Sequence, residues 1–158
     1  MTIDFTRLWH VGVIVPDLAS AMSELTAATG WEWTTPLERD VAVSVPPTEQ
    51  SCPVRWAANR TEAPQLEVIE AGTGIWSIDE NPGQTLHHLA YWSDDLEADA
   101  RGLVEQGYTW EAHGLDEHGV VRFVYLLSPS GVRIELGATW SEAAWNDWTS
   151  GEEYSVRF

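Results

Sequence analysis

The sequence predicts an α+β protein in which one structural unit occurs twice along the chain. Residues 8–18 and 86–96 can be aligned so that His10 meets His88 and Asp17 meets Asp95, each pair 78 positions apart. Both stretches begin with the alternation of a strand and continue with the apolar spacing of a helix. Residues 1–70 and 86–137 are therefore expected to form two βαβββ modules, each a strand, a helix and three further strands.

The first module begins with a strand over residues 8–16. Strict alternation places His10 on one face and Trp9 on the other. Asp17 is positioned to cap the following helix, and Gly30 is positioned to end it. Candidates for the three further strands are short apolar stretches bounded by turn residues, at 31–36, 41–45, 54–58 and 66–69.

The second module follows a linker, residues 71–85, that is rich in Gly, Pro and polar side chains. Its first strand covers 86–93, Asp94 or Asp95 caps a helix over 96–106, and strands follow at 108–112, 120–127 and 132–136. Residues 138–158 form an acidic tail that contains three tryptophans. This tail either packs as a short helix over the body or covers a pocket, and the sequence leaves both open.

The composition limits the classes of function. The chain has 158 residues and a net charge of −17, and all eight basic residues are Arg. Schiff-base chemistry on a lysine is therefore excluded, and so acidic a surface should repel nucleic acid and anionic membrane. The single Cys52 excludes a multi-cysteine metal site. Without a recognisable signal peptide or a membrane-length apolar run, a cytoplasmic protein is expected.

Two histidines and two glutamates occupy matched places in the two modules. His10 and His88 lie in the opening strands, and Glu67 and Glu135 lie between apolar residues in the closing strands. A carboxylate that faces a barrel interior costs several kcal/mol unless a partner compensates it. A divalent cation would compensate both carboxylates and also explain the histidines. Two imidazoles and two carboxylates suit Zn, Ni, Fe, Mn or Co, and the identity stays open.

The remaining histidines give weaker signals. A lone histidine in a strand is more often a packed residue than a ligand, whereas four donors at matched positions are harder to explain in that way. Alternation places His87 on the face opposite His88, so we expect no metal-binding role for it. His113 and His118 lie in or beside a Gly- and acid-rich hairpin, where a substrate contact is conceivable.

Residues 10–17, 66–69, 87–95 and 128–136, taken in order, resemble the vicinal oxygen chelate superfamily. This superfamily includes glyoxalase I, methylmalonyl-CoA epimerase, the extradiol dioxygenases and the bleomycin-resistance proteins. The resemblance implies curved mixed sheets that form two half-barrels around a central cavity. It also implies metal ligands from the first and last strand of each module, which here are His10, Glu67, His88 and Glu135. The epimerase usually has Gln where Glu67 stands.

The resemblance favours a glyoxalase-like isomerase, epimerase or lyase. Such an enzyme moves a proton through a metal-stabilised, enolate-like intermediate, with Glu135 or Glu67 as the base. Trp92 and Trp56 are expected to line the pocket, and ten tryptophans favour a small, neutral substrate that is apolar or aromatic.

Two alternatives remain. One is an Fe(II)-dependent extradiol-type dioxygenase, in which His10, His88 and Glu135 hold the iron. The other is a drug- or metabolite-binding resistance protein without enzymatic activity, which would bind a cationic aromatic ligand. A homodimer is expected, and the sequence does not decide whether the modules pair within one chain or between two chains.

Overall fold

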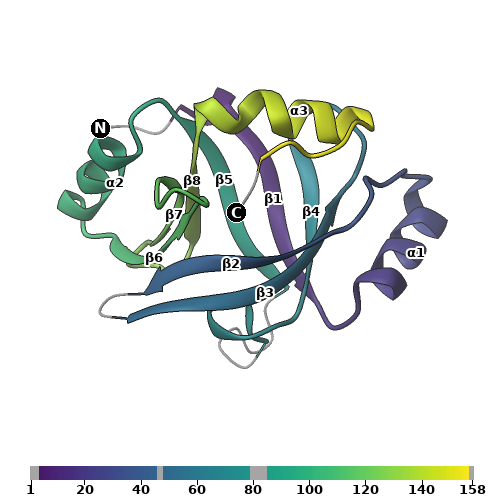
Figure 1. The fold of residues 1–158 in the computed structure, drawn as a ribbon, viewed down its shortest axis with the longest axis horizontal. Helices are drawn as coiled ribbons and strands as arrows, with labels where there is room; N and C mark the ends of the chain where they lie inside the picture. Colours follow the sequence, from purple (N-terminus) through teal and green to yellow (C-terminus); the bar gives the residue numbers. More distant parts are fainter. Residues whose placement is uncertain (1–3, 46–47, 79–84, 157–158) are drawn as a thin grey trace.

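The computed structural model describes residues 4–45, 48–78 and 85–156, and its strands close into one barrel (Figure 1). Part of the predicted linker, residues 79–84, and the last two residues of the predicted tail lie outside this description. The elements in chain order are the 3-10 turn Phe5–Arg7, β1 (Leu8–Val15), α1 (Leu18–Thr29), β2 (Leu37–Val45), β3 (Thr48–Ala58), β4 (Gln65–Glu70), the 3-10 turn Gly74–Trp76, β5 (Leu86–Ser93), α2 (Leu96–Glu105), β6 (Thr109–Leu115), β7 (Val121–Leu127), β8 (Arg133–Ala138), the 3-10 turn Thr139–Ser141 and α3 (Glu142–Ser150).

The order of the strands around the barrel is β1-β4-β3-β2-β6-β7-β8-β5. Within each half, the first and last strands are parallel, and the other neighbours are antiparallel. The halves meet at two seams, where β1 pairs with β5 and β2 pairs with β6, both antiparallel. The question left open by the sequence is thereby answered, because the two halves pair within a single chain. The predicted homodimer stays a prediction.

The helix starts follow from single capping residues. The Asp17 carboxylate accepts a hydrogen bond from the Ser20 N–H at 2.7 Å, and Asp95 accepts one from the Ala98 N–H at 3.1 Å. Asp95, rather than Asp94, is therefore the cap of α2. Gly30 ends α1 in the left-handed conformation with φ of 74°, where a side chain would be strained.

Residues 31–36 do not form the predicted strand. Trp33 makes only an isolated bridge to Asn59, and the sheet resumes with β2. The Trp33 indole instead packs beside α1, where it donates a hydrogen bond to the Thr26 hydroxyl at 2.9 Å. This segment is therefore a connection that covers the end of α1.

Three groups of apolar side chains stabilise this arrangement. The largest fills the barrel and includes six buried tryptophans, Trp9, Trp56, Trp76, Trp92, Trp145 and Trp148. Two smaller groups lie under α2 and under α1, which flank the barrel on opposite sides (Figure 1). The third helix, α3, runs across the ends of β5, β1 and β4. Within the described part of the chain, no helix has the length and apolarity to cross a membrane.

Candidate metal centre

Four donor side chains meet inside the barrel, each from one of four neighbouring strands. His10 is on β1, Glu67 on β4, His88 on β5 and Glu135 on β8, and all four are buried. The Nε2 atoms of the two histidines face each other at 2.6 Å. The His88 Nε2 atom lies 3.1 Å from a Glu135 carboxylate oxygen, and the His10 Nε2 atom lies 3.4 Å from one of Glu67. The four residues singled out in the sequence thus converge on one point.

Strand register explains this convergence. On β1, Gly12 lies opposite His88 on one side and Glu67 on the other. On β5, Ala90 lies opposite His10 on one side and Glu135 on the other. A methyl group on Gly12 would overlap the imidazole ring of His88. The glycine therefore leaves the space that this ring occupies.

Burial sets the protonation of the centre. It lowers the pKa of His88 well below its usual range, and the neighbouring His10 acts in the same direction. Burial raises the pKa of the Glu135 carboxyl to about 7, while the neighbouring His10 acts against this shift and the Glu67 carboxylate adds to it. A neutral imidazole is the form of histidine that binds a metal ion.

The donor set fits a divalent cation. One nitrogen from each histidine and one Glu135 oxygen lie within 4.8 Å of one another, and the Glu67 carboxylate lies beside both Nε2 atoms, at 3.4 Å and 3.6 Å. His10 Nδ1 is buried without a hydrogen-bond partner among the described residues. Nε2 is the ring nitrogen of His10 that faces the other donors. Imidazole nitrogens with carboxylate oxygens are the donors that Zn, Fe, Ni, Mn and Co accept.

Four β-bulges decide which side chains reach the interior. In each bulge one strand has one more residue than its partner, and the extra residues are Trp9, His87, Glu111 and Arg122. Such a bulge redirects a side chain and interrupts the alternation of faces. The predicted alternation is therefore wrong at Trp9, which does not point away from His10. Its ring lies edge-on to the His10 ring, with 4.0 Å between centroids.

The prediction that His87 points away from His88 is also wrong, for the same reason. The bulge places the His87 Nδ1 atom 2.8 Å from the Nδ1 atom of His88. The His87 Nε2 atom lies 2.9 Å from the Ile75 carbonyl oxygen, so the ring is held at both ends. Burial lowers the pKa of His87 to about 3, and the Arg133 guanidinium acts in the same direction. His87 is thus a neutral imidazole directly behind His88.

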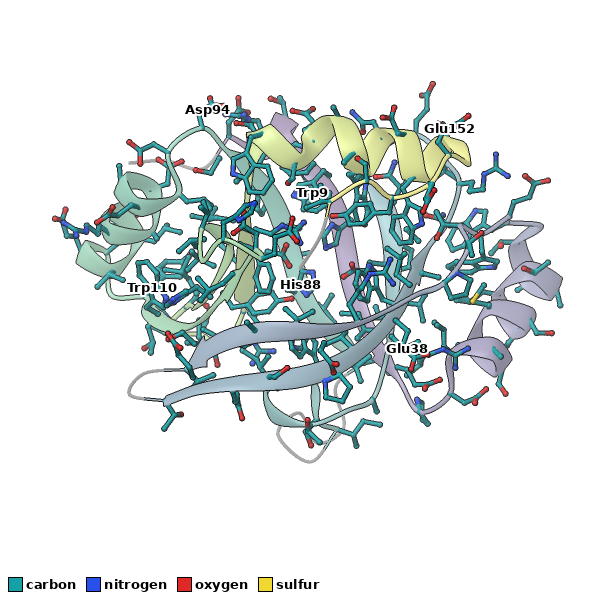
Figure 2. The ribbon with its side chains drawn as sticks, viewed as in Figure 1. Trp9, Glu38, His88, Asp94, Trp110 and Glu152 are labelled. Carbon is teal, nitrogen blue, oxygen red and sulfur yellow. The ribbon has the colours of Figure 1, made fainter. Side chains whose placement is uncertain are left out.

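A cavity opens onto three of the four donors, His10, Glu67 and Glu135, with about 620 Å³ of space between its lining atoms when its mouth is included. Trp92 and Trp56 line it, as expected from the sequence, together with Trp9, Trp76 and Trp145. Contact of these residues with a substrate stays a prediction. Figure 2 shows His88 and Trp9 in the middle of the molecule, with Trp9 beneath α3, and Asp94 and Glu152 at its periphery.

The tail both forms a helix over the body and closes part of the cavity. Trp145 on α3 stacks on the His10 ring, with 5.0 Å between centroids and 23° between planes. The Tyr154 side chain, beyond α3, also lines the cavity. The sequence left two possibilities open for the tail, and the structure combines them.

Other functional candidates were missed or are distant from the cavity. The Tyr125 side chain is buried beside Glu135, and the two residues face each other across β7 and β8. An inward-facing tyrosine opposite an inward-facing glutamate was a usable signal. Arg122 also lines the cavity and donates a hydrogen bond to the Tyr154 hydroxyl at 2.8 Å, but only a bulge brings it there. Neither His113 nor His118 is part of the cavity lining.

Comparison with known proteins gives the family. Residues 9–125 match the glyoxalase/bleomycin resistance protein/dioxygenase superfamily. The chain belongs to this superfamily. The resemblance to the vicinal oxygen chelate proteins is thereby confirmed, and so is the mixed α+β fold. The comparison with curated proteins gave no match.

Solved structures of the superfamily share this fold. A methylmalonyl-CoA epimerase from Mycobacterium tuberculosis is 21% identical with a TM-score of 0.58, and the match covers 87% of this chain and 91% of that one. A methylmalonyl-CoA epimerase in complex with methylmalonyl-CoA and NH4+ is 22% identical with a TM-score of 0.56, covering 84% and 93%. A hypothetical protein from Bacillus halodurans C-125 is 17% identical with a TM-score of 0.56, covering 83% and 92%. At these identities the likeness shows the fold alone.

Proposed function

We propose that this protein is a metal-dependent, glyoxalase-like enzyme that moves a proton on a small metabolite, as an isomerase, epimerase or lyase. The observation that carries the proposal is the convergence of four buried donors, His10, Glu67, His88 and Glu135, beside a cavity that three of them line. Metal-independent packing gives no reason to bury two carboxylates beside two imidazoles, because each buried charge costs free energy.

A divalent cation held by these four residues would supply Lewis-acid stabilisation of the enolate-like charge that develops when a proton leaves carbon. The chain itself has to supply the base that takes the proton. Both glutamates reach the centre, but Glu135 is packed beside the buried Tyr125, which lies opposite it across β7 and β8. The Glu67 carboxylate lies beside both Nε2 atoms, at 3.4 Å and 3.6 Å. We therefore assign the base to Glu67 and a fixed ligand position to Glu135.

The cavity walls support a substrate with an apolar or aromatic body. Trp9 and Trp92 both line the cavity and stack on each other with 3.8 Å between ring centroids. The scarcity of basic residues favours a neutral substrate, as the sequence suggests. Arg122 is the basic side chain among the described lining residues, so the substrate tests should include compounds with one carboxylate as well.

A second candidate is an Fe(II)-dependent extradiol-type dioxygenase. One observation favours it: His10, His88 and Glu135 form a compact group of two imidazoles and one carboxylate, the ligand set of non-haem Fe(II) oxygenases. In that case Glu67 would lie outside the ligand set.

Elemental analysis and anaerobic assays test the proposal together. The purified protein, or protein reconstituted with Zn²⁺, Ni²⁺, Mn²⁺, Co²⁺ or Fe²⁺, should retain about one metal ion per chain. Proton exchange at the carbon next to a carbonyl, followed by NMR in deuterated water, should proceed without dioxygen. Activity that requires both Fe²⁺ and dioxygen would replace the proposal with the dioxygenase. Failure to retain any metal, combined with tight binding of cationic aromatic compounds, would replace both with a binding protein.

A further inference from the structure

His87 connects the centre to the backbone through a chain of three hydrogen-bonding groups. The His88 ring presents Nε2 to His10 and Glu135, and its Nδ1 atom meets His87. The His87 Nε2 atom in turn meets the carbonyl oxygen of Ile75, which precedes Trp76 in the cavity wall. Both imidazoles are buried, with 3% and 1% of their surface exposed, so water does not replace these partners.

The direction of the protons in this chain is fixed at one end. A carbonyl oxygen only accepts hydrogen bonds, so the His87 Nε2 atom carries the proton. A second proton on His87 would place a positive charge on a side chain that is almost fully buried, which costs free energy. The neutral ring therefore leaves its Nδ1 atom as an acceptor. It follows that His88 donates from Nδ1 and keeps a lone pair on Nε2, the atom that faces the centre.

We infer that His87 is a positioning residue: it holds His88 in the Nδ1–H tautomer, so that the Nε2 lone pair points at the centre before any cation binds. The bulge at His87 gives this residue its position behind the ligand. Hydrogen bonds of this kind to a ligating histidine fix its tautomer and ring orientation. The consequence for metal affinity rests on the proposed function, whereas the tautomer itself does not.

Two variants separate this function from simple packing. In His87→Asn, the amide oxygen replaces the accepting Nδ1 atom but does not reach Ile75. In His87→Gln, the amide nitrogen replaces the donating Nε2 atom and reaches Ile75, but the acceptor for His88 is lost. His113→Gln is the matched control, because His113 is a strand histidine outside the cavity lining, with a Trp110 indole as its partner.

The first measurement uses metal-free protein and long-range ¹H–¹⁵N NMR of the histidine rings. In the wild type and in His87→Asn, the His88 Nε2 resonance should have the shift of an unprotonated ring nitrogen. In His87→Gln it should move toward the shift of a protonated one. A protonated His88 Nε2 atom in the wild type, or the same His88 spectrum in both His87 variants, would overturn the inference.

The second measurement is Zn²⁺ affinity by competition with a chelator. Loss of such a partner typically weakens metal binding by about 10- to 100-fold, and we expect this loss in His87→Gln. His87→Asn should stay within a few-fold of the wild type, and His113→Gln should not change. Equal losses in Asn and Gln would mean that His87 only packs. A wild type that binds no Zn²⁺ would refute the proposed function, while the NMR measurement would still decide the tautomer.

Discussion

The two halves of the barrel offer the same donors but support them differently. Each half supplies one histidine from its first strand and one glutamate from its last strand. In the second half, His88 has His87 behind it and Glu135 lies opposite the buried Tyr125 on β7. In the first half, the His10 Nδ1 atom has no hydrogen-bond partner among the described residues, and its ring is held by stacking on Trp145.

This difference separates ligand identity from ligand orientation. The repeated frame determines which residues reach the centre, and neighbours that are not repeated determine how rigidly each one is held. A held donor is suited to fixing a cation, whereas a less constrained carboxylate is suited to taking and returning a proton. The second half would then supply the fixed metal ligands, and the first half would supply the carboxylate that takes and returns the proton.

The largest expected effect comes from removing either histidine. His88→Ala and His10→Ala should each abolish retention of the metal through gel filtration, because each removes one ligand. Of the two variants, His88→Ala should have the lower residual metal affinity, because it removes the ligand whose ring is oriented before the metal binds. Chelator competition measures it. Metal retention in both variants would mean that the cation binds elsewhere.

The next effect separates the two glutamates. Glu67→Gln should keep the fold and the metal but lower turnover on the order of 10²-fold or more, because an amide oxygen still coordinates while the base is lost. Glu135→Gln should be milder in turnover. Turnover with the metal content of each variant measures this. The opposite ranking would transfer the base to Glu135, and no effect at Glu67 would favour the dioxygenase.

A smaller effect is expected when one methyl group is added to β1, in the first half of the barrel. Gly12→Ala should displace the His88 ring and lower Zn²⁺ affinity, and overpacking of this kind typically costs about 1–3 kcal/mol of folding free energy. Ala90→Gly, the matched position on β5, is the control, because it removes a methyl group beside His10 without a clash. Chemical denaturation and chelator competition measure the two effects. An unchanged Gly12→Ala variant would show that the ring does not depend on this space.

The smallest effect is a change of slope with pH in metal-free protein. The pKa of His87 is about 3 in the folded state, against the ordinary histidine value of 6.5 in an unfolded chain, so the unfolded chain binds the extra proton between these values. The contribution of this group is therefore complete above pH 6.5 and is lost as the pH falls toward 3. Its slope approaches about 1.4 kcal/mol per pH unit.

The control for this slope is His87→Asn, which does not titrate there. Glu135 acts in the opposite direction, since its raised pKa removes stability as the pH rises from 4.5 to about 7. Only the difference between the wild type and His87→Asn, from urea denaturation at several pH values, therefore reports on His87. Parallel curves for the two proteins would contradict a buried, neutral His87.

Much of this architecture follows from sequence periodicity. The repeat predicted both first strands, both helices and the convergence of four donors, because duplicated units place equivalent residues at equivalent register. The bulges could not be predicted, since an extra residue such as His87 has no local sequence signature. The helix α3 was also ambiguous, because its fit against His10 depends on the assembled barrel. Trp145 could be recognised as buried only once both β1 and α3 were in place.

The seam between β1 and β5 links the stability of the folded chain to the proposed metal ion. Two donors lie on each side of the seam, so the proposed cation would tie the halves together as a removable cross-link. A ligand that binds only the folded chain stabilises it by about 4 kcal/mol when its free concentration is a thousand times its dissociation constant. The concentration of free metal would then control not only the activity but also how much of the chain is folded and resists proteolysis.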